Sequence, residues 1–174
     1  KVKTFPVSFP LRENQGNITI TSNTPSKEQI INQAIQLHLK GNIPEATKYY
    51  QQSISQGCND HRVFSNYWII LKNLGNIQEA ESSTRKAIKI KPDFAKGHYN
   101  LGNILKNLGK LKEAELSTCK AIELNPDYAK AHYNMGIILS DLGKSQESFA
   151  YFLRIIEINT TIPNIYPVIT RFLQ

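Results

Sequence analysis

The sequence predicts an all-α protein in which pairs of helices stack into a solenoid. The first observation is a period of 34 residues, because the stretch from His98 to Ala131 aligns without a gap to the stretch that begins at His132. The second is a glycine at the same place in four successive units: Gly41, Gly75, Gly109 and Gly143. The third is an amphipathic stretch of about 13 residues on either side of each glycine, which is typical of two helices joined by a tight turn. Because one such pair cannot bury its apolar face alone, neighbouring pairs are expected to share a continuous core.

The N-terminal segment, residues 1–26, is the first element and differs from the rest of the chain. It has no helical period, and prolines stand at Pro6, Pro10 and Pro25. We therefore expect an extended, flexible leader. A sharper alternative is that the leader docks on a helical groove of its own chain or of a neighbour, through alternating apolar residues: Phe5, Val7, Phe9 and Leu11.

Four repeat units follow the leader. They are predicted at 27–60, 61–94, 95–128 and 129–162. Ser26 with Gln29 predicts a capping box at the start of the first helix, and Asn42 and Asn76 are expected to cap two of the second helices. Small residues stand where the two helices of a unit must approach closely: Ala46, Ala80, Ala114, Gly102 and Gly136.

Residues 163–174 are the last element and predict one further helix, which starts a fifth repeat or a following domain. Tyr166 and Leu173 match inward positions of the repeat, while Ile165 and Phe172 add apolar surface elsewhere. A helix this apolar needs a cover on more than one face. We therefore expect the chain to be a fragment of a larger protein.

The third unit has the fullest repeat pattern: Leu101-Gly102, Gly109, Ala114, Ala121 and Pro126. This pattern and the period of 34 resemble the tetratricopeptide repeat (TPR) family, over roughly residues 27–162. The resemblance implies a right-handed superhelical solenoid of helix-turn-helix TPR units. It also implies a non-catalytic protein-protein interaction scaffold that binds an extended peptide segment in a concave groove lined by the first helices.

The groove is expected to contain a row of asparagines, because one asparagine of each unit stands at a place that faces the groove in the family's repeat: Asn32, Asn66, Asn100 and Asn134. A carboxamide offers both a donor and an acceptor, so such a row could bind a peptide backbone independently of its side chains. The row resembles the asparagine ladder in the TPR arm of O-linked N-acetylglucosamine transferases. The other possibility is that these side chains bond neighbouring helices.

Five cations are expected on the same surface, at two recurring places of the units: Arg62, Lys72, Lys96, Lys106 and Lys130. Their recurrence with the structural period favours an acidic or polar peptide over a simple solvated face. Further aromatic and amide contacts complete the predicted groove: Tyr99, Tyr133 and Asn103. His98 and His132 also repeat at one place, and we expect them to pack between repeats rather than to act in catalysis.

The stretch Gly136–Ser145 ends in Gly-Lys-Ser and raises the possibility of a nucleotide-binding loop. A phosphate loop needs four residues between its two glycines, whereas six separate Gly136 from Gly143. Those six residues read as an amphipathic helix, so we interpret the motif as a coincidence at an inter-helix turn. With no other catalytic arrangement in the chain, the sequence predicts that the protein is not an enzyme.

Composition narrows the class of partner and the compartment. A net charge of +7 favours acidic partners, while interleaved Glu and Asp residues disfavour nucleic acid. Cys58 and Cys119 form no metal-binding or disulfide pattern, so no metal and no cofactor is expected and a reducing, cytoplasmic location is predicted. No apolar run reaches the roughly 18 residues of a membrane span, so the sequence predicts no membrane-spanning helix.

Two alternatives stay open beside the scaffold. The array resembles the substrate-presenting TPR arm of a larger transferase-type enzyme whose catalytic domain is not in this chain. Self-association through the leader or the last helix is the other alternative.

Overall fold

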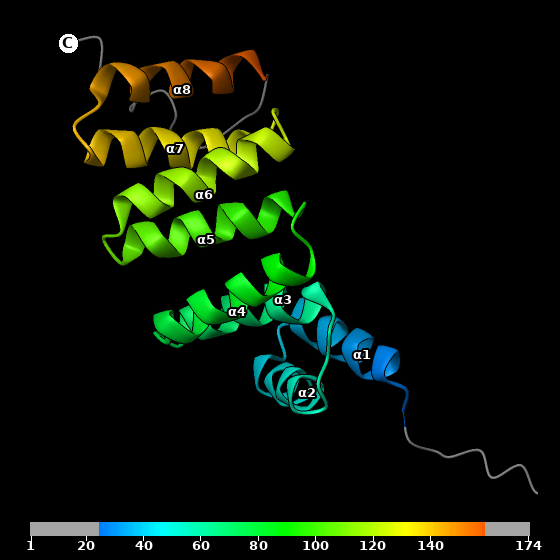
Figure 1. Ribbon diagram of the computed structural model, residues 1–174. Coiled ribbons are helices and arrows are strands. Elements are labelled where there is room, and N and C mark those ends of the chain that lie inside the picture. Colours follow the sequence, from blue (N-terminus) through cyan, green and yellow to red (C-terminus); the bar gives the residue numbers. More distant parts are fainter. Residues whose placement is uncertain (1–24, 159–174) are drawn as a thin grey trace, which may run out of the picture.

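The computed structural model describes residues 25–158, and within that range the chain forms eight α-helices and no strand. The first helices of the pairs are α1 (Lys27–Leu39), α3 (His61–Asn73), α5 (Ala95–Asn107) and α7 (Ala129–Asp141). The second helices are α2 (Ile43–Ser55), α4 (Ile77–Ile90), α6 (Leu111–Leu124) and α8 (Ser145–Glu157). The pairs stack one on another along the molecule (Figure 1). This arrangement confirms the all-α helical repeat solenoid. The predicted last helix at 163–174, and the leader up to residue 24, lie outside the described residues.

The turn between the two helices of each pair depends on a glycine in the left-handed region. Gly75 has a φ of +80° and, like its three counterparts, joins two helices in a turn that an L side chain adopts only with strain. The Gly75 N–H donates to the Lys72 carbonyl (3.0 Å), and the Asn76 N–H donates to the Leu71 carbonyl (2.9 Å). These two bonds satisfy the last carbonyls of α3, so the helix ends there.

Side-chain caps are present at some helix starts only. The Gln29 N–H donates to Ser26 Oγ (3.2 Å) and the Ser26 N–H donates to Gln29 Oε1 (2.7 Å), so the expected capping box forms. Asn42 accepts from the Glu45 N–H (3.4 Å) and caps α2. Asn76 makes no such bond, so the expectation of a cap at α4 was wrong.

The helices of a pair approach closely where small residues stand. A Cβ added at Gly102 would lie 2.2 Å from Thr118 Oγ1, and one added at Gly136 would lie 2.5 Å from the ring of Phe152. Ala114 on the facing helix has no exposed surface. The third and fourth helix pairs therefore leave no room for a side chain at this height, as the small residues predicted.

The second repeat departs from this rule, because Trp68 stands where the third and fourth repeats have Gly102 and Gly136. Its side chain packs with Leu71 and also reaches Ile104 of α5. The indole is only 7% exposed. Trp68 therefore belongs to the core that the second and third repeats share.

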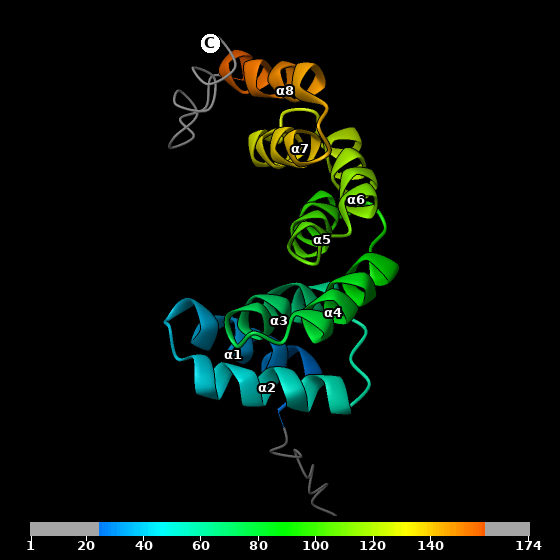
Figure 2. The same cartoon turned by 90° about the vertical axis from the view of Figure 1, so that its left-hand side faces the viewer.

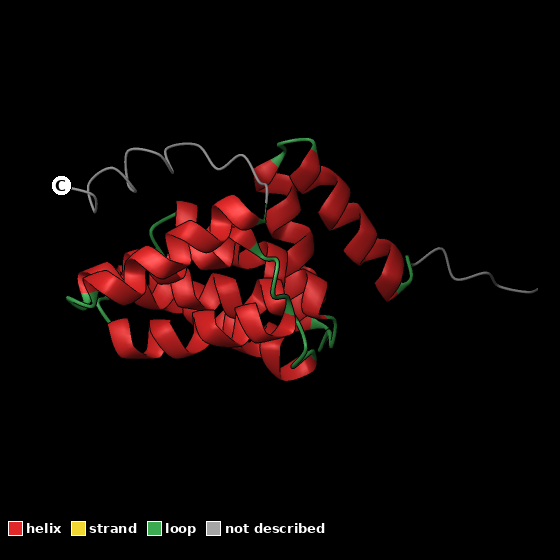
Figure 3. Ribbon diagram, turned by 90° about the horizontal axis from the view of Figure 1, so that it is seen from above, coloured by secondary structure: helices red, strands yellow, loops and turns green. Residues whose placement is uncertain are grey.

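The core is continuous along the stack, since each of the first three clusters joins one pair to the first helix of the next. Ile31 and Tyr50 pack with Val63 of α3, and Leu105 and Ile138 bring α5 and α7 together. Viewed from the side, α3, α5 and α7 lie on one side of the stack, and α4 and α6 lie on the other (Figure 2). Viewed from above, the described part of the chain consists of helices joined by short turns (Figure 3).

Candidate functional site

The side of the stack formed by α3, α5 and α7, called here the first-helix surface, has an unbalanced charge. Helices α3 and α5 contain no Asp or Glu, and α7 contains only Asp141, at its last position. The same three helices carry the five predicted cations. Stacking therefore gathers positive charge on one side of the molecule.

Four of these cations, Lys72, Lys96, Lys106 and Lys130, form no ion pair with any residue between 25 and 158. Lys72, Lys96 and Lys130 are exposed, and Lys106 is half-buried. The Nζ of Lys72 lies 5.8 Å from the centroid of the Trp68 ring, which is within reach of a cation–π contact. The other three ammonium groups keep their charge available to a ligand.

Arg62 differs from the lysines because its guanidinium is already neutralised. Its Nη2 lies 2.6 Å from Asp60 Oδ2 and 2.9 Å from Glu28 Oε1, the latter on α1 of the preceding repeat. The hydrogen bonds that Arg62 donates to Asp60 and Glu28 raise the pKa of Arg62 above its ordinary value. Burial alone would raise the pKa of Asp60, but the bonds from Arg62 outweigh it and hold that pKa low. Arg62 therefore joins two repeats rather than adding free charge.

The asparagine row is graded from exposed to buried along the stack. Asn32 is exposed and Asn66 is half-buried, whereas Asn100 and Asn134 are only 2% and 4% exposed. Asn134 Nδ2 donates to Thr118 Oγ1 of the preceding repeat (3.3 Å). Asn100 Nδ2 is buried and has no hydrogen-bond partner among the described residues. As they lie, only Asn32 and Asn66 present carboxamide surface to solvent.

Asn66 also reaches back to the preceding repeat. Burial raises the pKa of Tyr50 to about 12, even though a hydrogen bond with Asn66 favours the ionised form. The asparagine place in the second and fourth repeats thus contacts the same place of the preceding second helix, occupied by Tyr50 and Thr118. Asn66 and Asn134 therefore form hydrogen bonds between neighbouring helices.

The remaining predicted residues line the surface while packing on neighbours. The ring of Tyr99 lies 5.1 Å from that of Tyr128, and the ring of Tyr133 lies 5.9 Å from that of Phe152. Both tyrosines are half-buried, as is Asn103. Each therefore keeps part of its surface accessible to solvent.

The opposite side of the stack contains ion pairs that sequence reasoning missed. Lys110 Nζ lies 3.1 Å from Glu81 Oε2, and one repeat later Lys144 Nζ lies 2.8 Å from Glu115 Oε1. A signal was present, because Glu81 and Glu115, like Lys110 and Lys144, are 34 residues apart. Lys144 belongs to the Gly-Lys-Ser stretch, in which Gly143 forms the turn between two helices. The ammonium group of Lys144 is paired with Glu115.

His98 and His132 act between repeats, as their common place predicted. The Nε2–H of His98 donates to the carbonyl of Pro92 (2.9 Å), and that of His132 donates to the carbonyl of Pro126 (2.7 Å). Both bonds tie a first helix to the turn that precedes it. Among residues 25–158, no group of three His, Cys, Asp or Glu side chains could hold a metal ion.

Comparison with known families finds the repeat itself. Models described as "Tetratricopeptide repeat" match residues 69–94, 95–128 and 120–150. Comparison with curated protein sequences gives no match. In the described part of the chain, no helix is both long enough and apolar enough to cross a membrane.

Solved structures share the fold at low sequence identity. MamA is 17% identical, with a TM-score of 0.72 over 77% of this chain and 78% of that protein. PilF of Pseudomonas aeruginosa is 17% identical, with a TM-score of 0.74 over 84% of this chain and 67% of that one. YrrB, described as a TPR protein with an unusual peptide-binding site, is 19% identical, with a TM-score of 0.69 over 76% and 69% of the two chains.

Proposed function

This chain is a tetratricopeptide repeat protein, and from that premise we propose that its first-helix surface binds an extended acidic segment of a partner protein. The repeat family and the structural neighbours support a protein-protein interaction scaffold. The acidic character of the partner is the finer part of the proposal and depends on the charges of this chain.

The observation that carries the proposal is that the cations of α3, α5 and α7 have almost no carboxylates on their own helices, whereas α4 and α6 carry both signs of charge. On the second helices, Arg85 pairs with Glu81 and Lys120 pairs with Glu123. On the first helices, Lys96, Lys106 and Lys130 have no carboxylate within reach in the described range. A carboxylate-bearing partner is the ligand that such a surface attracts, because unpaired charges of one sign create a positive field there.

The lysines are proposed to give the attraction, and neighbouring groups the fit. Lys96 and Lys130 stand at the same place in successive repeats, so an extended segment running along the stack meets them in turn. Asn32, Asn66 and Asn103 are the amide groups with solvent access, and they suit the backbone of such a segment. Asn134, which is buried, contributes by bonding to Thr118 of the preceding repeat, and Asn100 is buried as well.

Charge reversal tests the proposal. We expect Lys96→Glu/Lys130→Glu to weaken binding of a fluorescein-labelled 15-residue peptide of alternating Glu and Ala by about tenfold or more, since each exposed charge contact is worth up to roughly 1 kcal/mol and reversal adds repulsion. Fluorescence anisotropy measures the affinity. The same peptide with Gln in place of Glu is expected to bind weakly to both proteins.

Matched controls separate this surface from net charge alone. Lys89→Glu/Lys112→Glu makes the same change in net charge on α4 and α6, where both lysines are exposed and unpaired within the described part. We expect this variant to lose far less affinity than the Lys96/Lys130 variant, and circular dichroism should show equal helicity for both. Equal losses in the two variants would contradict a specific site.

A further inference from the structure

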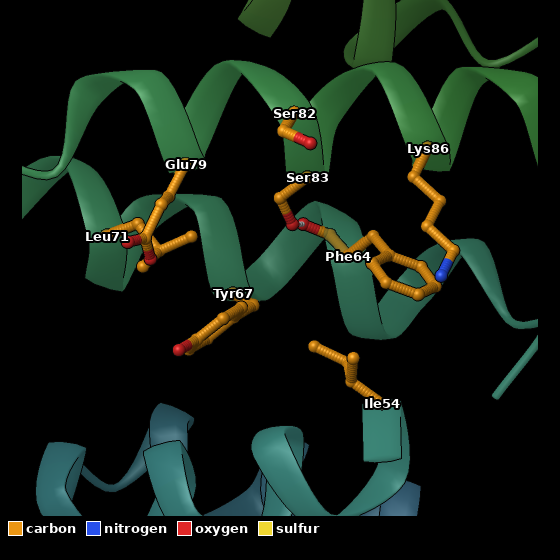
Figure 4. Close-up of a pocket in the computed structure, with 8 residues that line it drawn as sticks. All are labelled: Ile54, Phe64, Tyr67, Leu71, Glu79, Ser82, Ser83 and Lys86. Atoms are coloured by element: carbon orange, nitrogen blue, oxygen red, sulfur yellow. Dashed lines mark hydrogen bonds between the residues drawn. The ribbon is translucent and has the colours of Figure 1, made fainter. Parts of the chain in front are cut away.

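A hollow of about 260 Å³ lies between the first and second repeats, away from the predicted groove residues. Ile54, in the last turn of α2, points toward Phe64 and Tyr67 of α3 across this space (Figure 4). Leu71 closes one end. A hollow of this size is just below the range of small-molecule pockets, about 300–1,000 Å³, and suits one or two apolar side chains.

The hollow exists because two adjacent small residues face it from α4. Ser82 and Ser83 line the side opposite Ile54, and Ser83 Oγ donates to the Phe64 carbonyl (3.1 Å). Two repeats later the counterpart of Ser83 is Tyr151, whose ring lies 5.8 Å from that of His132. At the hollow, α4 has Ser83 at this place and so supplies no aromatic ring against Phe64, the counterpart of His132.

The rim of the hollow is polar. Lys86 Nζ lies 4.5 Å from the centroid of the Phe64 ring, so this lysine lies over the aromatic wall. Glu79 stands at the other end of the same helix face. An apolar interior with a polar rim is the form of a site that anchors a peptide side chain.

The N-terminus of α1 lies at the end of α2 that carries Ile54. Lys27 Nζ donates to the Gln56 carbonyl (3.4 Å), so the start of α1 contacts the end of α2. Ile54, which forms one wall of the hollow, is in the same turn as Gln56. Pro25, which precedes the cap residue Ser26 of α1, therefore lies toward the end of α2 that carries Ile54.

The preceding chain contains a suitable segment. Phe5, Val7, Phe9 and Leu11 alternate with other residues. Phe5 and Phe9 each precede a proline, which biases them to extended conformations, and extended chain places alternate residues on one face. The fourteen steps from Leu11 to Pro25 span up to about 46 Å, whereas a helix of 13 residues is only about 20 Å long, so the segment can reach the whole hollow.

We propose that this leader segment, residues 5–11, docks on its own chain by placing Phe9 or Phe5 in the hollow between the first and second repeats. The contact would close the first junction from outside and leave the first-helix surface open. It is independent of the peptide-binding function proposed above, since no predicted groove residue lines the hollow.

Site-directed photocrosslinking of the full chain tests the docking. With p-benzoylphenylalanine at position 9, we expect crosslinks within one chain to peptides that contain Ile54, Phe64 or Ser82, mapped by mass spectrometry. Ser82→Trp fills the hollow and should abolish these crosslinks, while Gln78→Trp, at an exposed position of the same helix, should retain them. Crosslinks that survive Ser82→Trp, that fall on the first-helix surface, or that join two chains would overturn the proposal.

A second measurement does not depend on filling the hollow. In the full chain, Phe5→Ser/Phe9→Ser should speed amide hydrogen exchange in the last turn of α2 by about tenfold, the factor expected when a buried aromatic contact is lost. Val7→Ser alone is the milder comparison. Unchanged exchange in the double variant would contradict docking even if Ser82→Trp failed to fold.

Discussion

The junction between α2 and α3 is built differently from the junctions α4–α5 and α6–α7. In the two later junctions, the chain passes through Pro92 or Pro126, and His98 or His132 donates a hydrogen bond to that proline's carbonyl. In the first junction, α2 is followed by Gly57, with a φ of +70°. Cys58 and Phe64 stand where the later junctions have their Pro and His, so that bond has no counterpart.

Ion pairs between second helices also distinguish the later junctions from the first. The pairs Glu81–Lys110 and Glu115–Lys144 join the second helices of adjacent repeats. The corresponding residues at the first junction are Thr47 and Asn76, which carry no charge. One class of contact between repeats is therefore missing from the N-terminal end of the array.

The first junction relies instead on an aromatic cluster and one ionic cluster. Tyr50 is completely buried, its hydroxyl lies 3.3 Å from His38 Nδ1, and its ring lies 6.0 Å from that of Tyr67. Arg62 joins Glu28 across the same junction. Because each repeat of a solenoid contacts only its neighbours, a difference at one junction changes the coupling of everything beyond it. We therefore expect α1 and α2 to separate from the array before the later repeats do.

The largest effect is expected from Tyr50→Ala, which removes the buried ring at the first junction. The loss should be about 3–5 kcal/mol, the usual cost of deleting a buried aromatic side chain. Hydrogen exchange should show α1 and α2 losing protection while α5 to α8 keep theirs, because the damage is confined to one end.

Thr118→Ala is the matched change at the same place of the third repeat. It removes the partner of Asn134 and should cost about 1–2 kcal/mol, spread over the later repeats. A uniform loss of protection along the whole chain in Tyr50→Ala would show that the first junction is as strongly coupled as the others.

A medium effect is expected from His132→Phe, which makes the third junction resemble the first. An aromatic ring is kept and the bond to the Pro126 carbonyl is lost, so the free energy of unfolding should fall by about 1–2 kcal/mol. Urea denaturation measures the change as a lower midpoint with an unaltered slope. His98→Phe is the comparison and should cost less, because His98 is more exposed than His132. No shift in either variant would mean that the histidines serve only as packing.

The smallest effect is expected from adding the missing ion pair to the first junction. Thr47→Glu/Asn76→Lys copies the residues found at the next junction, and a partly exposed pair contributes about 0.2–1 kcal/mol. The gain should vanish at 1 M NaCl, where screening is strong, and each single variant is the control. Single variants that stabilise as much as the double would show that the two side chains do not meet across the first junction.

Much of the fold was predictable because it repeats with the sequence. The period, the glycine turns and the small residues at the close approach each recur, and a repeated pattern is easier to interpret than a single one. Even so, Trp68 breaks the small-residue rule, and nothing local to α3 indicates that its indole packs on Ile104 of the next repeat. Contacts between units depend on residues 34 apart or more, which a window of one helix does not contain.

The sequence predicted which residues lie on the candidate groove, but not which of them remain free to contact a ligand. The five cations and four asparagines occupy the places that the repeat assigns to them. Only the assembled structure distinguishes Arg62, held by Asp60 and Glu28, from Lys96 and Lys130, which have no partner in residues 25–158. The role of these residues in binding, the cytoplasmic location and the transferase-arm alternative stay predictions.

The sequence by itself determined the number of helices in each unit, where each pair turns and which side of the stack collects positive charge, because these follow from local conformation and periodicity. Tertiary structure alone decided which polar groups pair with other groups of the protein. Asn134 donates a hydrogen bond to Thr118 and Lys144 forms an ion pair with Glu115, whereas Ser82 and Ser83 leave a hollow beside Ile54. The physical reason is that burial and pairing belong to the contact between two repeats, and neither repeat contains that contact alone.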